Sequence, residues 1–309
     1  MYKKIKLLIA SVIGLSTLIS CAPINHYDYV EGKINIVTTT TMLGDLAKSI
    51  GGDDVSVTIL MKPGVDPHSY NPKPSDARAL AKADLVVING LHLEAKMGDV
   101  LLSIDANKRF IASDGLVALS TIQIIENMEG QPDPHIWGDV NNWMVVAETF
   151  KEKMMAFDPS NASEYESRYN AYQLELSDLE QYIEDRVNEL SAEKKVLITA
   201  HDAFAYFGRA HEFSVHSIQG ISTQSEASVK DIQDLANLVV ELNVKAIFVE
   251  TSVPENTIRS VIEAVEARGR SLNIGGHLYS DSLGDNKSGG ETYVKMCKHN
   301  VDTIVDALI

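Results

Sequence analysis

Short apolar segments rich in β-branched residues alternate with helical patterns along this chain, and no other feature constrains its fold as strongly. The first series predicts strands at 34–40, 55–60 and 85–88, with helices at 42–50 and 75–83 between them. Short buried strands that alternate with helices are typical of parallel sheets covered by helices on both faces. Ligands of such sheets bind beyond the carboxyl ends of the strands, so functional residues are expected in the loops that follow them.

A long helical pattern interrupts this alternation in the middle of the chain. After Asp158-Pro159, residues Asn161 and Glu164 are spaced as a capping box. Apolar residues then recur at steps of three and four, namely Tyr165, Tyr169, Tyr172, Leu176, Leu179, Ile183, Val187 and Leu190. About thirty residues of helix span about 45 Å, the height of a whole domain. Such a helix could pack along one domain, but the series that follows it favours a strut between two lobes.

That second series predicts four further strands and three helices. The strands are expected at 196–199, 214–218, 246–249 and 272–274, and the helices at 229–243, at 255–267 and from 292 onward. The sequence therefore predicts an α/β fold of two lobes, 33–158 and 192–309, joined by a linker helix at 159–191. Each lobe is expected to be a mostly parallel sheet flanked by helices, with the functional site in the cleft between them.

The first residues of the chain have the pattern of an export signal. Three lysines precede an uncharged apolar run at 7–19, which is shorter than the roughly 20 residues of a permanent membrane helix. The run ends at Ser20-Cys21, which resembles a bacterial lipobox. We therefore expect a lipoprotein signal peptide at 1–20, lipidation of Cys21 and a tether over 21–32. The alternative is an ordinary secretory signal that happens to end near a cysteine.

Charge and composition exclude several classes of protein. The chain has 27 Lys and Arg against 43 Asp and Glu, a formal net charge of −16. Nucleic-acid binding is not expected, because it needs a basic surface that displaces counterions from phosphates. With 45% hydrophobic and 23% charged residues, the composition is that of a folded globular protein. An acidic surface suits a cation as ligand, although acidity alone is commonly a solubility feature.

Three histidines and one aspartate stand where strand ends or rigid loops would present them to a cleft. His68 and His135 each close an Asp-Pro-His tripeptide, in which proline restricts the backbone. His201 follows the strand at 196–199, and Asp281 lies in a Gly/Ser-rich loop after the last predicted strand. Three neutral imidazoles and one carboxylate suit a borderline divalent cation. Zinc is favoured, and manganese is compatible, particularly with a carboxylate that binds through both oxygens.

The other histidines and the neighbouring carboxylates need separate interpretations. Asp66 and Asp133 are candidates to accept the second ring N–H of the adjacent histidine and fix its tautomer. A lone loop histidine is more often hydrogen-bonded or solvated than a ligand, and the doubled tripeptide is what favours ligation at His68 and His135. Ordinary structural roles are expected for Cys297, in helix packing, and for His26, His92, His211, His216, His277 and His299. The sequence has no HExxH pair, Gly-rich phosphate loop or Gly-x-Ser-x-Gly elbow.

Six stretches of the chain carry a family resemblance. They are Met-Lys-Pro-Gly-Val-Asp-Pro-His-Ser-Tyr at 61–70, Ile-Asn-Gly-Leu-His-Leu-Glu at 88–94, Asp-Pro-His-Ile-Trp at 133–137, Thr-Ala-His-Asp-Ala-Phe at 199–204, Gly-Ile-Ser-Thr-Gln-Ser-Glu at 220–226 and Gly-His-Leu-Tyr-Ser-Asp at 276–281. In this order they are highly specific. From about Ile34 to its end, the chain resembles the TroA/ZnuA/PsaA-type (cluster A-I) metal-binding lipoproteins of zinc and manganese ABC importers. Its His-His-His-Asp pattern is of the TroA type.

The resemblance implies both a site and a function. At the matching positions of the family, the cleft metal is bound by the residues that are His68, His135, His201 and Asp281 here. The chain is therefore expected to be a solute-binding lipoprotein and not an enzyme. It would capture one divalent ion, with Zn²⁺ favoured over Mn²⁺, and deliver it to an ABC transporter permease. It is expected to be extracytoplasmic, lipid-anchored to the cell membrane, on the periplasmic side in a two-membrane cell. A tethered receptor needs no second copy, so a monomer is expected.

Two alternatives belong to other functional classes. A mononuclear metallohydrolase could use the same ligands with Glu250 or Glu226 as general base, but it would need an open coordination position and an activated water. Surface adhesion is a role attributed to some members of the family. The sequence itself has no feature that favours or opposes adhesion.

Overall fold

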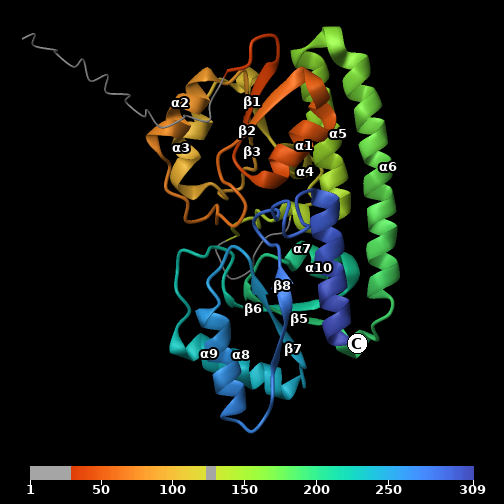
Figure 1. The fold of residues 1–309 in the computed structure, drawn as a ribbon. Helices are drawn as coiled ribbons and strands as arrows, with labels where there is room; N and C mark the ends of the chain where they lie inside the picture. Colours follow the sequence, from red (N-terminus) through yellow and green to blue (C-terminus); the bar gives the residue numbers. More distant parts are fainter. Residues whose placement is uncertain (1–28, 123–129) are drawn as a thin grey trace, which may run out of the picture.

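The computed structural model describes residues 29–122 and 130–309, which form two lobes beside one long helix (Figure 1). The predicted signal peptide at 1–20 and the predicted lipidation at Cys21 lie outside the described residues. Within the described ranges, no helix combines the length and the apolar character needed to cross a membrane. The predicted α/β class is confirmed, since parallel strands flanked by helices recur in both lobes.

The N-terminal lobe is built on one parallel sheet in the order β2-β1-β3-β4. Its strands are β1 (Ile34–Thr38), β2 (Val55–Ile59), β3 (Leu85–Ile88) and β4 (Arg109–Ile111). Its helices are α1 (Thr41–Gly51), α2 (Pro74–Lys82), α3 (Gly98–Leu102), α4 (Asp114–Ala118) and α5 (Val140–Phe157). Neighbouring side chains of β1 point to opposite faces, so that Ile36 enters one buried apolar cluster and Val37 another. Both faces of the sheet are therefore covered, as a parallel sheet requires.

The C-terminal lobe contains two parallel pairs, β5 with β6 and β7 with β8, and β5 lies against β7. The strands are β5 (Val196–His201), β6 (Ser214–Gln219), β7 (Ala246–Glu250) and β8 (Asn273–Leu278). The helices are α7 (Ala205–His211), α8 (Val229–Glu241), α9 (Asn256–Glu266) and α10 (Tyr293–Leu308). Short 3₁₀ turns are η1 (Gly52–Asp54), η2 (Ala95–Met97), η3 (Ala106–Lys108), η4 (Ile136–Gly138), η5 (Pro159–Asn161) and η6 (Ala192–Lys194).

Helix α6 (Ala162–Val187) runs along both lobes (Figure 1). It contacts α1 and α5 of the N-terminal lobe and α10 of the C-terminal lobe. Most of its predicted apolar stripe is buried, including Leu176 and Ile183. Arg168 donates to Asp54 at 2.8 Å on one lobe, and Arg186 donates to Asp302 at 2.8 Å on the other. The helix is thus packed against, and hydrogen-bonded to, both halves of the molecule.

Local predictions needed correction at three points. Asn161 makes no side-chain cap; instead, the Asp158 carboxylate accepts from the Asn161 amide at 2.8 Å and from the Tyr165 hydroxyl at 2.9 Å. Helix α2 spans Pro74–Lys82, one residue earlier at each end than the predicted 75–83. The last strand is longer than expected, because glycines taken for a loop continue β8 to Leu278. Glycine lacks a Cβ and so reads as a turn former even where it is part of a strand.

One apolar core crosses the boundary between the lobes. At its centre the Trp143 indole of α5 stacks on the Tyr293 ring of α10, with ring centroids 4.9 Å apart and planes 19° from parallel. Trp143 Nε1 donates to the Tyr172 hydroxyl at 3.0 Å, and the Tyr293 hydroxyl donates to the Trp137 carbonyl at 2.8 Å. Both aromatic side chains are fully buried. The two lobes therefore share packing as well as a connecting helix.

Candidate metal centre

Four side chains that are distant in sequence converge between the lobes. One ligand atom from each of His68, His135, His201 and Asp281 lies within 4.8 Å of the others. Their exposed fractions are 2%, 0%, 0% and 1%, respectively. Among residues 29–122 and 130–309, this is the one group of His, Cys, Asp or Glu found to have metal-binding geometry. The structure thus brings together all four candidates named from the sequence.

Each candidate ligand comes from a loop or strand end at the facing edges of the lobes. His68 lies in the loop after β2, and His135 immediately precedes η4. His201 is the last residue of β5, and Asp281 follows the end of β8. Three of the four candidates, His68, His201 and Asp281, thus lie at or after the end of a strand, as expected for a parallel sheet, whereas His135 lies in the loop before η4.

The ligand atoms of the four side chains lie close to one another. His68 Nε2 is 3.2 Å from His135 Nε2. The two oxygens of Asp281 face different imidazoles: Oδ1 is 3.4 Å from His135 Nε2, and Oδ2 is 3.2 Å from His201 Nε2. Asp281 Oδ1 and His201 Nε2 are buried without a hydrogen-bond partner among the described residues. Buried polar atoms are normally paired, so these two atoms fit a cation that would complete their coordination.

The Asp133 carboxylate orients the His135 ring, as the sequence predicts. Asp133 Oδ1 accepts from His135 Nδ1 at 2.8 Å and from the His135 backbone N–H at 2.9 Å. A proton held on Nδ1 leaves Nε2 free to bind a cation. The geometry therefore supports the predicted role of Asp133.

Asp66 does not have the predicted role. Its Oδ1 accepts the backbone N–H of His68 at 2.8 Å, rather than a ring N–H. Its Oδ2 accepts from the hydroxyls of Ser69 at 2.7 Å and Thr223 at 2.5 Å. The two Asp-Pro-His tripeptides are therefore identical in sequence but not in geometry. The Asp66 carboxylate is hydrogen-bonded to Thr223 of the opposite lobe and not to the His68 ring.

Glu250 is the functional carboxylate that sequence reasoning assigned differently. Its Oε2 lies 2.5 Å from His201 Nδ1, and its Oε1 accepts the backbone N–H groups of Ala200 and His201, each at 2.9 Å. Glu250 ends β7, next to β5, and is 3% exposed. The sequence signal that could have indicated this role is that Glu250, like His201, stands at the end of a predicted strand. Both oxygens of Glu250 are thus directed at the end of β5, which suits Glu250 to hold the His201 ring.

A second buried carboxylate shapes the loop that carries His135. Glu94 Oε1 accepts from the Thr39 hydroxyl at 2.6 Å and the Asn89 backbone N–H at 2.7 Å. Asn89 Nδ2 in turn donates to the Pro134 carbonyl at 2.9 Å. This network links the ends of β1 and β3 to the residue before His135, which accounts structurally for the 88–94 stretch.

Burial and charge set opposing pKa shifts within the cluster. Burial lowers the pKa of His68 to about 4, and the neighbouring imidazoles act in the same direction. Burial opposes protonation of His135 too, but the charges and hydrogen bonds of Asp133 and Asp281 outweigh it and raise its pKa to about 9. The pKa of His201 is raised through Glu250 and Asp281, against burial. The nearby imidazolium charges, chiefly that of His201, lower the pKa of Asp281 despite its burial.

These shifts predict that cation binding releases protons. The raised pKa values of His135 and His201 favour the imidazolium form of both rings in the metal-free protein at neutral pH, whereas coordination needs a lone pair on one nitrogen of each ring. Affinity should therefore rise with pH between 6 and 8, by about one decade per pH unit for each proton displaced. Titration calorimetry at pH 7 in buffers of different ionisation enthalpy counts the protons. A pH-independent affinity with no proton release would contradict this protonation pattern.

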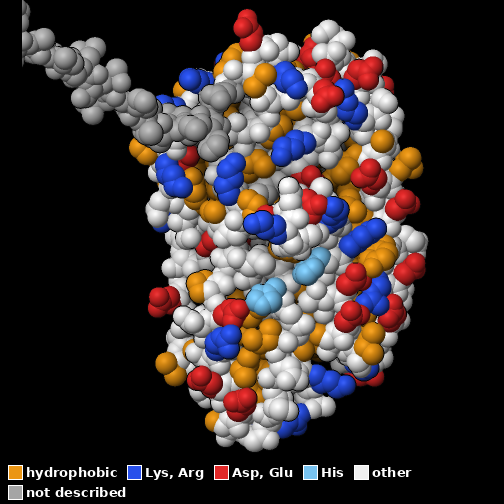
Figure 2. All heavy atoms as spheres, viewed as in Figure 1, with side chains coloured by type: hydrophobic (Ala, Val, Ile, Leu, Met, Phe, Trp, Pro, Cys, Tyr) orange, Lys and Arg blue, Asp and Glu red, His pale blue; other side chains and the backbone are white. Residues whose placement is uncertain are grey.

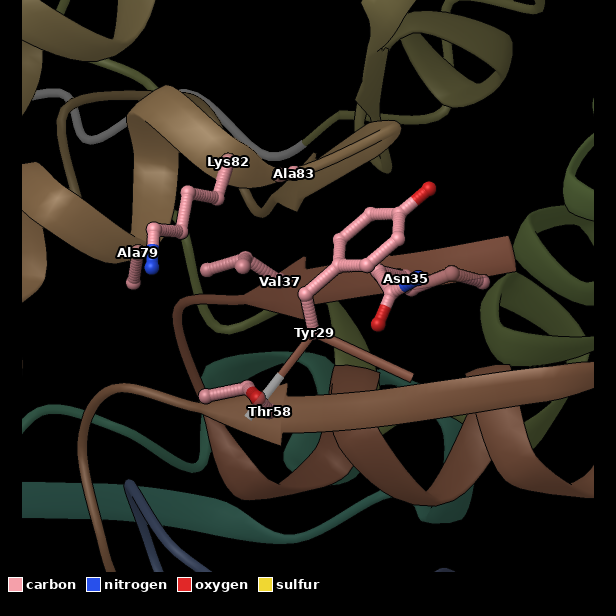
Figure 3. A pocket seen from close by; sticks show the side chains of 8 residues that line it. Tyr29, Asn35, Val37, Thr58, Ala79, Lys82 and Ala83 are labelled. Carbon is pink, nitrogen blue, oxygen red and sulfur yellow. The ribbon is translucent and has the colours of Figure 1, made fainter. Parts of the chain in front are cut away.

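Other histidines and pockets lie outside the cluster. His92, His211, His216, His277 and His299 do not join it, and His26 is outside the described residues. Cys297 is packed against the main core on α10, and burial raises its pKa to about 12. A pocket of about 20 Å³ lies between α2 and the N-terminal sheet, and its lining includes Tyr29, Asn35, Thr58 and Lys82 (Figure 3). Its lining offers neither an imidazole nor a carboxylate, so it does not resemble a metal site.

The comparisons with known proteins agree on one family. The family model described as ZnuA, zinc-uptake complex component A periplasmic, matches residues 36–307. The zinc-binding protein TroA of Treponema pallidum is 42% identical over 278 residues, covering 90% of this chain and 90% of that protein. The manganese-binding lipoprotein MntA of Bacillus subtilis is 36% identical over 303 residues, covering 98% of each.

Solved structures show the same relationship. The periplasmic zinc-binding protein TroA from Treponema pallidum superposes with a TM-score of 0.85 at 42% identity, covering 90% of this chain and 99% of that one. A mutant of a periplasmic metal-binding protein from Candidatus Liberibacter asiaticus, solved with manganese, gives a TM-score of 0.79 at 27% identity, covering 90% of this chain and 100% of that one. The fold, the order of the motifs and the family match lead to one conclusion: this chain belongs to the ZnuA family of metal-uptake binding proteins.

Proposed function

We propose that this chain captures a divalent transition metal outside the cytoplasmic membrane and delivers it to an ABC-type permease. The observation that carries the proposal is the buried convergence of three imidazoles and one carboxylate between two lobes. His68 and His135 come from the N-terminal lobe, whereas His201 and Asp281 come from the C-terminal lobe. An ion bound by all four would join the lobes and favour one closed arrangement. On this proposal, 33–158 and 192–309 act as the two lobes and 159–191 as their linker.

Zinc is the favoured cargo on the chemistry of the ligands. Three neutral imidazoles suit zinc better than manganese, which prefers oxygen ligands. Each Asp281 oxygen lies beside the Nε2 of a different imidazole, so both oxygens could bind one ion. A five-coordinate manganese ion is therefore also compatible with these four ligands. TroA is named as zinc-binding and MntA as manganese-binding, so the names of relatives span both metals.

The proposed location follows from the N-terminal pattern together with the family. We infer a lipid on Cys21 and a tether that leads to the first strand. The relative MntA, which spans 98% of both chains, is named a lipoprotein. Over the face drawn in Figure 2, acidic and basic side chains are interspersed, which gives nucleic acid no continuous basic surface. A monomer is sufficient for this function, because one chain supplies the whole ligand set.

Glu250→Gln should weaken zinc binding by roughly 10- to 100-fold, the usual cost of losing the outer partner of a ligating histidine. The substitution removes the charge beside His201 Nδ1 while keeping the shape of the side chain. Glu226→Gln is the matched control, since Glu226 is exposed and outside the cluster. Competition with a chromophoric chelator measures both variants. Equal affinities for the Glu250 variant and the wild type would remove Glu250 from the site.

The proposed function is tested by competitive titration of the chain from Ala22, stripped of metal. One tight equivalent of Zn²⁺, well ahead of Mn²⁺, is the expected result. Comparable or tighter Mn²⁺ binding would keep the metal-uptake function and overturn the zinc preference. If neither ion bound stoichiometrically, the proposed function would be wrong.

A further inference from the structure

The ring of His68 is supported differently from the other three ligands. Asp133 contacts the His135 ring, Glu250 contacts the His201 ring, and the Ser252 hydroxyl lies 3.4 Å from Asp281 Oδ2. In each case the supporting group belongs to the same lobe as the ligand. Within the described ranges, no carboxylate is paired with the His68 ring. The hydrogen bonds to side chains of other residues that hold His68 in place are made through its backbone instead.

Two side chains of the opposite lobe hold that backbone. Gln224 Nε2 donates to the His68 carbonyl at 2.6 Å. Thr223 Oγ1 donates at 2.5 Å to Asp66 Oδ2, and the other oxygen of Asp66 accepts the His68 N–H at 2.8 Å. Both peptide groups flanking the His68 Cα are thus fixed, one directly and one through Asp66, by neighbouring residues of the C-terminal lobe.

The segment that carries these donors is itself anchored in the C-terminal lobe. It links the end of β6 to the start of α8 and comprises residues 220–228. Gln219 Nε2 donates to the Ser225 carbonyl at 2.9 Å, and a capping box at Ser228 begins α8. When the lobes meet, this segment therefore presents Thr223 and Gln224 to the N-terminal lobe from a braced position. Residues 220–226 of this segment are one of the six stretches that carry the family resemblance, yet they contain none of the four candidate ligands.

The same segment forms one wall of a cavity beside the metal cluster. This cavity, of about 550 Å³, is lined by residues of both lobes, which include Asp66, Thr223, Glu226 and Ser252. Ser252 Oγ also lies 2.9 Å from Ser280 Oγ, next to Asp281. Asp66 and Thr223, which are hydrogen-bonded to each other across the lobes, thus both line this cavity, and Asp66 also holds the His68 backbone.

We propose that Thr223 and Gln224 are positioning residues that couple closure of the two lobes to coordination by His68. Breaking their hydrogen bonds would release the His68 segment and separate the lobes at the cavity, so the bound ion would leave faster. This inference rests on the proposed metal-binding function and adds the residues that determine how long the ion is retained.

The test compares near-isosteric variants with and without the donor groups. Thr223→Val removes the hydroxyl, Thr223→Ser retains it, and Gln224→Met removes the amide donor. Ser225→Ala is the matched control, because Ser225 is exposed on the same segment and is held through its backbone carbonyl, which the substitution keeps. Stopped-flow transfer of Zn²⁺ to an excess of chelator gives the dissociation rate. Thermal unfolding of the metal-free proteins reports whether a variant merely damages the fold.

We expect Thr223→Val to accelerate zinc dissociation roughly tenfold and Gln224→Met about fivefold, as for a lost hydrogen bond to a charged and to a neutral acceptor. Thr223→Ser and Ser225→Ala should behave as wild type, and the Tm of each metal-free variant should be unchanged. Wild-type rates in both donor-less variants would overturn the inference, as would an equal acceleration by Ser225→Ala or a matching loss of Tm. Failure of the wild type to bind either zinc or manganese would instead overturn the proposed function.

Discussion

His201→Ala should reduce zinc affinity by more than roughly 100-fold, because loss of even an outer partner of a metal ligand costs 10- to 100-fold. The substitution removes one of three imidazoles and leaves Glu250 buried beside an empty space. It also removes the nitrogen that lies 3.2 Å from Asp281 Oδ2. Zinc should therefore no longer raise the Tm of the variant, since stabilisation by a ligand follows its affinity. Chelator competition gives the affinity, and thermal unfolding with and without zinc gives the shift.

His92→Ala is the control for this experiment. His92 is exposed and lies outside the cluster. Its substitution therefore tests a loop histidine that has no metal-ligand geometry. Its affinity for zinc should stay close to that of the wild type. Equal losses in the two variants, or no loss in either, would overturn the assignment of His201 as a ligand.

Trp143→Ala should lower the free energy of unfolding of the metal-free protein by about 3–5 kcal/mol, the usual cost of truncating a buried aromatic residue. Trp143 is fully buried, stacks on Tyr293 and donates to the Tyr172 hydroxyl. The cavity would open where helices α5, α6 and α10 meet, at the core shared by the lobes. Urea unfolding followed by circular dichroism measures the change.

Two further variants separate packing from other causes of instability. Trp143→Phe keeps an aromatic ring against Tyr293 but loses the N–H donor, so its loss should be smaller than that of Trp143→Ala. Leu174→Ala alters an α6 side chain that is 68% exposed and should stay within about 0.5 kcal/mol of the wild type. A loss below 1 kcal/mol for Trp143→Ala would show that the two lobes do not depend on this shared core.

The sequence predicted the elements whose signals are local. Strand β3 was expected at the observed residues 85–88, and the start of α10 matches the predicted position after Thr292. Helix α5 was not predicted, although Trp143 and Phe150 lie on its buried face at a helical spacing. Asp139 caps its first turn by accepting the Asn141 N–H at 2.8 Å.

In the candidate site, too, the sequence indicated the residues with local signals and missed the contacts between distant residues. His68 and His135 stood out because proline and aspartate precede both, and His201 stood out because it follows a strand. Their role as ligands is the proposal that the metal titrations test. The partners of the ligands were predicted only where the partner is two residues away, as for Asp133 and His135. The same argument applied to Asp66 was wrong, because a residue 157 positions away competes for its carboxylate.

The sequence by itself thus determined the α/β class, the two strand–helix series and the four side chains that converge in the cleft. Backbone propensity and hydrophobic periodicity act over a few residues, so they can be read without a fold. Only the tertiary structure decided the support of those side chains: Glu250 behind His201, and Thr223 and Gln224 behind His68. These contacts join residues 49 to 157 positions apart, and their geometry exists only after strands and loops have packed. A hydrogen bond needs its two atoms within about 3 Å, a precision that only the packed lobes supply.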